Sequence, residues 1–138
     1  MERNYKVKWA GGHSFIGTSG SGHSMVIDGD KVLGMSPMEL LLLSAGSCAC
    51  IDVVMILKKA RQKVIDAWVE VGGERREEMP KYYTDIELHF VVKGMGVKEQ
   101  HVQRSIDLAM KKYCSASAQL AALADVRTSY EIIEAEVP

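Results

Sequence analysis

The hydrophobic pattern of the first 35 residues predicts strands. From Tyr5 to Ile27, short apolar runs alternate with polar residues, as in Tyr5, Val7 and Trp9, which is typical of half-buried strands. The glycine pair at 11–12 and the segment SGSG at 19–22 separate these runs and are turn signals. Residues 4–35 are therefore predicted to form a β-meander.

The next pattern, over residues 36–60, predicts a long helix. Ser36, Pro37 and Glu39 form a helix start signal, in which the serine and glutamate side chains cap amides of the first turn. Residues 40–51 carry no charge, and apolar residues occupy every face of the helical wheel. We therefore expect the helix to be buried on all sides. The 12 uncharged residues fall short of the roughly 20 of a membrane span.

The second half of the chain returns to strands and adds shorter helices. Apolar and polar positions alternate over residues 65–71 and 84–92, so each strand is expected to have one face in the core and one face in solvent. A sheet with one solvent-exposed face favours antiparallel pairing. Residues 97–113 predict an amphipathic helix, a short helix follows Cys114, and residues 126–132 predict a last strand. The fold class is therefore α+β, with antiparallel sheets around the buried helix.

One domain spanning residues 1–138 is expected, because the chain shows no linker or repeat. A single small sheet would shield only one side of the apolar helix, so we also predict a homodimer. The composition is 47% hydrophobic and 25% charged with a net charge of −1, which favours neither nucleic acid nor an anionic membrane as a partner. The N-terminus lacks a signal-peptide pattern, and an odd number of cysteines favours a cytoplasmic protein with a free thiol.

The three cysteines are the candidate reactive groups. Cys48 lies in the middle of the central helix, where a packing role and a reactive role both remain open. Asp52, four residues on, shares its face and opposes ionisation of the thiol, so a reactive Cys48 needs a cation from elsewhere. Cys50 points away from Cys48, and packing is its expected role. Cys114 follows a helix and is a candidate resolving partner, although sequence spacing cannot show that two thiols meet.

No metal or cofactor site is expected from the spacing of histidines and cysteines. The glycines near residue 20 do not form a phosphate loop, because no GK[ST] motif follows them. The charged segment ERREE is most simply solvent-exposed, and its Arg75-Arg76 pair is the most obvious cation source for a thiol.

Two motifs resemble the OsmC/Ohr family of osmotically inducible and organic hydroperoxide resistance proteins. In SPMELLLLSAGSC, a proline precedes the cysteine by the eleven residues that separate Pro37 from Cys48, and YCSAS at Cys114 matches the second family cysteine. The order of predicted elements agrees over nearly the whole chain. The pieces VKW, ERREE and LHF also resemble the YhfA-like branch of the family.

The resemblance implies an intertwined homodimer with two sites at the subunit interface. It implies that Cys48 attacks a hydroperoxide as a thiolate, that Cys114 resolves the sulfenic acid as a disulfide, and that an external dithiol reductant resets the pair. Better-studied members carry an arginine in the first sheet and a glutamate directly after the proline. Here Met38 takes the glutamate position and His13 is nearest to the arginine position, so slower peroxide reduction is expected.

Two alternatives remain open at the level of sequence. A non-catalytic member of the same fold would bind a small apolar ligand at the dimer interface, with its cysteines in packing roles. A hot-dog domain also wraps a sheet around a buried helix, but it would leave Cys114 without a role.

Overall fold

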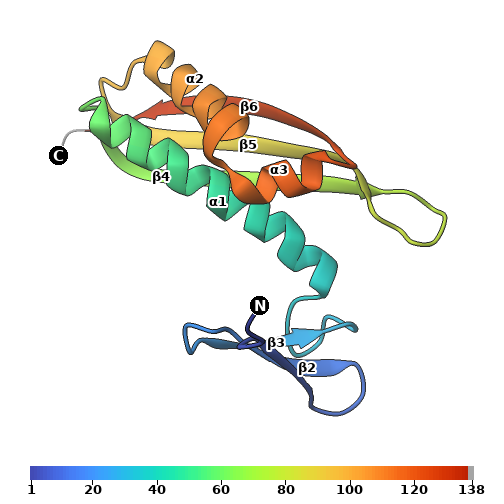
Figure 1. Ribbon diagram of the computed structural model, residues 1–138. Helices are drawn as coiled ribbons and strands as arrows, with labels where there is room; N and C mark the ends of the chain where they lie inside the picture. The colour runs from blue at the N-terminus through green and yellow to red at the C-terminus, as the bar shows by residue number, and fades with distance from the viewer. Residues whose placement is uncertain (137–138) are drawn as a thin grey trace. The chain divides into compact units, whose positions relative to one another are not determined.

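The computed structural model describes residues 1–136, which divide into two compact units, residues 1–41 and residue 42 onward (Figure 1). In chain order, the elements are strands β1 (Lys6–Trp9), β2 (Ser14–Thr18) and β3 (Ser24–Asp28), helix α1 (Pro37–Lys59), strands β4 (Lys63–Arg75) and β5 (Tyr83–Met95), helix α2 (Glu99–Leu108), π-helix η1 (Ala109–Tyr113), helix α3 (Ser115–Ala121) and strand β6 (Asp125–Glu134).

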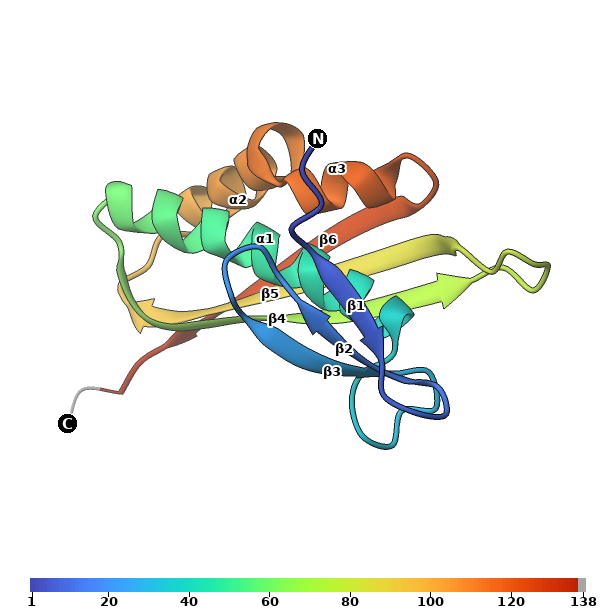
Figure 2. The ribbon, with the colours of Figure 1, turned by 60° about the horizontal axis from the view of Figure 1, so that its bottom comes forward.

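The first unit contains the predicted meander. Its strands form an antiparallel sheet in the order β1-β2-β3, in which Phe15 pairs with Ile27 (Figure 2). Gly11 and Gly12 adopt φ values of 99° and 54° in the first turn, a backbone conformation that glycine reaches without a Cβ clash.

Helix α1 starts as its capping signal predicts. The Glu39 amide donates to Ser36 Oγ at 3.2 Å, and the Ser36 amide donates to Glu39 Oε1 at 2.9 Å. This reciprocal pair satisfies two backbone donors that would otherwise lack partners at the helix start. Lys58 and Lys59 lie in the last turn, where their charge opposes the negative end of the helix dipole.

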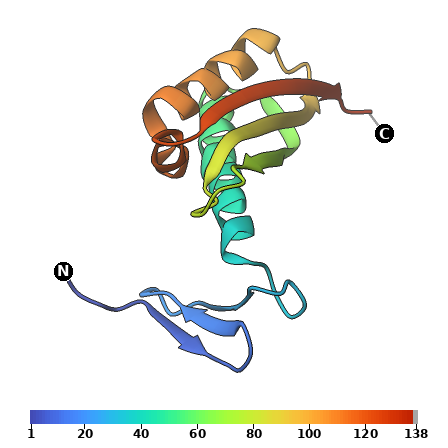
Figure 3. The ribbon, with the colours of Figure 1, turned by 90° about the vertical axis from the view of Figure 1, so that its right-hand side faces the viewer.

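The second unit is built on a three-stranded sheet in the order β4-β5-β6. Helices α2 and α3 and the part of α1 within this unit cover one face of the sheet (Figures 1 and 3). The central strand β5 is almost inaccessible on the covered face, where Ile86, Leu88 and Phe90 are at most 1% exposed. The predicted α+β class is confirmed.

Two details of this sheet differ from expectation. Strands β4 and β5 pair antiparallel, but β6 runs parallel to β5. The prediction of antiparallel sheets is therefore wrong for β6, because the connection through α2, η1 and α3 returns the chain to the end at which β5 starts. A register shift between Val64 and Asp66 forms a bulge, so Ile65 is 58% exposed although its alternation with polar neighbours predicts burial.

Helix α1 is buried on one face only. Ala45, Gly46, Ala49, Val53 and Leu57 form its buried face. Its opposite face leaves large apolar side chains 49–59% exposed, namely Leu43, Ile51 and Met55. By length and composition alone α1 passes the test for a membrane span, but one face is packed against a sheet. The expectation of burial on all sides is therefore wrong for a single chain, and a second covering surface is needed.

We expect the chain to form a stable dimer through this exposed face of α1. Replacing Ile51 with Glu should raise the dimer dissociation constant at least tenfold, because burying an unpaired carboxylate costs roughly several kcal/mol. Sedimentation at micromolar concentration measures the shift.

Ile65→Glu is the matched control for this experiment. Ile65 is 58% exposed and Ile51 is 59% exposed, but Ile65 lies on β4 rather than α1. The control should leave the dimer unchanged. A wild-type chain that sediments as a stable monomer would contradict the prediction.

Candidate active site

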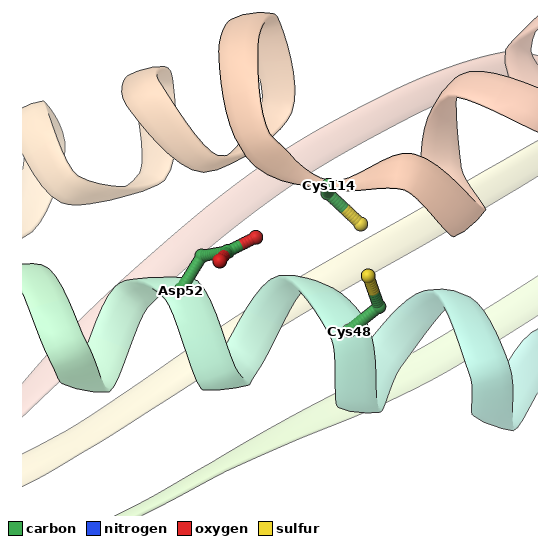
Figure 4. A group of neighbouring side chains, drawn as sticks. All are labelled: Cys48, Asp52 and Cys114. Atoms are coloured by element: carbon green, nitrogen blue, oxygen red, sulfur yellow. The ribbon is translucent and has the colours of Figure 1, made fainter.

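Three chemically reactive side chains meet between α1 and the start of α3. The two sulfur atoms of Cys48 and Cys114 and a carboxylate oxygen of Asp52 all lie within 4.8 Å of one another (Figure 4). Cys48 and Asp52 are four residues apart on α1 and therefore occupy one helix face, as the sequence predicts. Cys114 comes from a segment 66 residues further along the chain, and only the folded structure shows that it faces Cys48.

The position of Cys114 depends on the π-helix that precedes it. The Cys114 amide donates to the carbonyl oxygen of Ala109 at 2.7 Å, which closes the wide π turn and brings the chain into an extended conformation at φ −75° and ψ 98°. Single π turns inside helical segments are frequent at functional sites. The segment that the sequence predicts as one helix over residues 97–113 is thus an α-helix followed by a π turn that sets the direction of the thiol.

Cys114 is 3% exposed, and Ser117 supplies its main polar contacts. The Ser117 amide donates to the Cys114 sulfur at 3.4 Å, and the Ser117 hydroxyl lies 3.0 Å from it. Burial raises the pKa of the Cys114 thiol above its ordinary value. The bonds from Ser117 lower this pKa in part, and the neighbouring Cys48 thiol raises it further.

Cys50 is not a member of this three-residue group. It is half-buried on α1, and burial raises the pKa of its thiol. A thiol with a raised pKa is a poor nucleophile at neutral pH. The packing role expected for Cys50 stays a prediction.

The cations that the sequence offers for Cys48 have other partners. Arg76 donates to the carbonyl oxygens of Pro80 and Met79 at 2.8 and 3.3 Å, and its guanidinium stacks on the Tyr82 ring at 4.3 Å. Arg76 is thereby engaged within the β4–β5 hairpin. In the first unit, exposed His13 pairs with Asp30 at 2.9 Å, and this hydrogen bond raises the pKa of His13.

A cavity beside Asp52 is lined by two cationic side chains that the sequence does not identify as neighbours of the cysteines. Its volume is about 340 Å³, and Lys59 and Arg104 contribute to its walls. The other walls are largely apolar and come from α1, α2 and η1, including Met55, Leu108 and Tyr113. Lys59 is seven residues after Asp52, so helical periodicity alone places it on the same face. Arg104 is on another helix, and no local pattern shows its proximity.

The site has the chemical parts of a thiol redox centre. Cys48 is half-buried and projects from a capped helix, whereas Cys114 is buried and lies at a junction between two helical segments. To form a disulfide, the two sulfur atoms must close from a separation of at most 4.8 Å to a bond length of about 2.05 Å.

Comparisons with known proteins agree with this architecture. The profile of the family described as OsmC-like protein matches residues 28–129. Protein YhfA of Escherichia coli is 46% identical over 133 residues, which cover 94% of this chain and 98% of that protein. The crystal structure of a hypothetical protein from Aquifex aeolicus is 34% identical, covers 99% of this chain and 100% of its own, and has a TM-score of 0.88.

The organic hydroperoxide resistance protein OhrB of Bacillus subtilis shares the fold. Its crystal structure has a TM-score of 0.61 at 18% identity and covers 92% of this chain and 97% of its own. The family profile and the identity to YhfA over nearly the full length are more specific than this shared fold. By its match to the family profile and its identity to YhfA over nearly the full length, the chain belongs to the OsmC-like protein family.

Proposed function

We propose that the protein reduces organic hydroperoxides through a redox pair formed by Cys48 and Cys114. The observation that carries this proposal is the approach of the two sulfur atoms to within 4.8 Å. Solved structures of organic hydroperoxide resistance proteins share the fold, which supports the same reaction type.

The accessibility of the two thiols supports an assignment of roles. Half-buried Cys48 is the attacking thiol, because a peroxide reaches it more readily than it reaches Cys114, which is 3% exposed. The Cys48 thiolate attacks one peroxide oxygen, the O–O bond breaks, and the alkoxide leaves as the alcohol after taking a proton. Cys48 is then a sulfenic acid. The Cys114 thiolate attacks its sulfur, the S–O bond breaks, and the hydroxide takes a proton and leaves as water, which leaves the disulfide. An external dithiol reduces the disulfide and restores both thiols.

The surroundings predict a slow first step. Asp52 places a carboxylate oxygen within 4.8 Å of the attacking sulfur, and its negative charge repels negative charge on that sulfur. Lys59 and Arg104 line the adjoining cavity, and their positive charges offset part of that negative charge. The apolar walls of the same cavity suit the organic group of a hydroperoxide.

A second candidate function is the binding of a small apolar ligand without chemistry. The cavity beside Asp52 favours it, because its volume of about 340 Å³ lies in the range of small-molecule sites. In that case the cysteines would be packing residues, and hydroperoxide would leave the thiols unchanged.

One equivalent of an organic hydroperoxide should remove two free thiols per chain and form an intramolecular bond between Cys48 and Cys114. Thiol counting and peptide mapping measure this outcome. Cys48→Ser should slow peroxide consumption by at least 100-fold, because the nucleophile is lost. Cys114→Ser should still consume one equivalent and stop at the sulfenic acid. Three free thiols after treatment, at a rate no faster than a model thiol, would exclude the redox function in favour of ligand binding.

Cys50→Ala should retain peroxide turnover within about twofold of wild type, since Cys50 points away from the redox pair. The substitution should lower the free energy of unfolding by at most about 3 kcal/mol, because it removes one half-buried sulfur. Steady-state turnover and thermal unfolding of the same preparation measure both quantities. A folded Cys50→Ala protein that no longer reacts would identify Cys50 as the nucleophile.

Ser117→Ala should slow disulfide closure at neutral pH by about tenfold, because the hydroxyl stabilises the Cys114 thiolate. The Cys114 pKa is raised, so its thiolate appears only at higher pH, and closure should accelerate as pH rises toward and beyond the ordinary thiol value of 9.0. Ser117→Ala should move this profile to still higher pH. Single-turnover measurement of the disulfide across pH tests both effects, and exposed Ser115→Ala is the matched control. Identical profiles for wild type and Ser117→Ala would exclude this role for the hydroxyl.

A further inference from the structure

The three side chains of the redox site also form a set of metal ligands. The two sulfur atoms and one carboxylate oxygen lie within 4.8 Å of one another. Asp52 forms no ion pair within 4.0 Å among residues 1–136. We propose that the reduced protein binds one zinc ion per chain through Cys48, Asp52 and Cys114.

The distances are close to those that zinc requires. Tetrahedral zinc holds thiolate sulfur at about 2.3 Å and carboxylate oxygen at about 2.0–2.2 Å, so ligand atoms around it are separated by roughly 3.5–3.8 Å. From the 4.8 Å limit, the ligand atoms need to approach one another by at most roughly 1.0–1.3 Å, which side-chain rotation can supply. Three protein ligands leave the fourth zinc position open to water.

The helix and the π turn that carry the three ligands hold these side chains in defined positions. Cys48 and Asp52 are four residues apart on one helix face, a spacing that zinc sites on helices use. Cys114 is held by the π turn, and its sulfur accepts a hydrogen bond from the Ser117 amide. Hydrogen bonds of this kind orient metal ligands and tune their basicity.

The ligand types select zinc over the hard divalent cations. Thiolates are soft ligands that favour zinc, whereas magnesium and calcium prefer sites made only of oxygen. Two thiolates and one carboxylate carry a charge of −3, and the zinc ion neutralises two of these charges. Lys59 and Arg104 line the cavity that Asp52 also lines, so two cations lie near the site that retains this negative charge.

Zinc binding and thiol oxidation would oppose each other. Bound zinc slows the reaction of the thiols with hydroperoxide, and oxidation of the thiols releases the zinc. The metal displaces the two thiol protons, so binding by the reduced protein releases two protons. Both sulfur electron pairs then bind zinc, and hydroperoxide reacts more slowly with them. Once the disulfide forms, neither sulfur remains as a thiolate, and the zinc ion is released.

The test is a titration of the reduced protein, freed of metal with a chelator, in competition with a chromophoric zinc chelator. One zinc ion per chain should bind with a dissociation constant below about 10 μM, with release of two protons at neutral pH. Cobalt substitution should give a thiolate-to-cobalt charge-transfer band.

Cys48→Ser, Cys114→Ser and Asp52→Asn should each weaken binding by about 10- to 100-fold. Cys50→Ala and Asp107→Asn, which change a thiol and an exposed carboxylate outside the group, should bind within twofold of wild type.

A control on the wild-type chain guards against variants that fail to fold. Alkylating the thiols with N-ethylmaleimide should abolish zinc binding. Zinc binding that is absent, that survives alkylation, or that depends on Cys50 would overturn the inference. The titration contains no peroxide, so a protein that binds zinc but does not reduce hydroperoxides would refute only the proposed function.

Discussion

The close packing of α1 against β4 fixes the rest of the second unit. A Cβ atom at Gly46 would lie 2.8 Å from a methyl group of Val71 and 3.1 Å from one of Val69. Only glycine allows the helix to approach the strand so closely at this position. Ala45 and Ala49 extend the same small face and are at most 1% exposed. Because this face must point into the sheet, the Cys48 side chain is directed toward the start of α3.

The same packing leaves a second apolar face of α1 uncovered. Leu43 and Ile51 recur on the side away from the sheet, at 49% and 59% exposure. Large apolar side chains in such a row mark an interaction surface in a soluble protein. The helix that carries Cys48 and Asp52 thus also carries large apolar side chains that the single chain leaves exposed.

Local patterns predict one half of the site and not the other. The capping box at Ser36 and the i, i+4 relation of Cys48 and Asp52 follow from helix geometry, so the sequence determines them. The approach of Cys114 depends on a π turn and on a connection that leads into a parallel strand. These are properties of chain packing, and no residue spacing encodes them. The exposure of Ile65 depends on a bulge, which interrupts the period-2 pattern on which the strand prediction rests.

Charge explains why this geometry allows more than one state of the thiols. Two thiolates beside Asp52 would place three negative charges within 4.8 Å, and such a group does not persist unless its charge is reduced. Protons, a disulfide bond and a zinc ion each reduce it, and each requires the same two sulfur atoms. These three states are therefore mutually exclusive at the pair. The supply of protons, oxidant and metal then decides which one is populated, and the positive charges of Lys59 and Arg104 in the adjoining cavity favour states that retain negative charge.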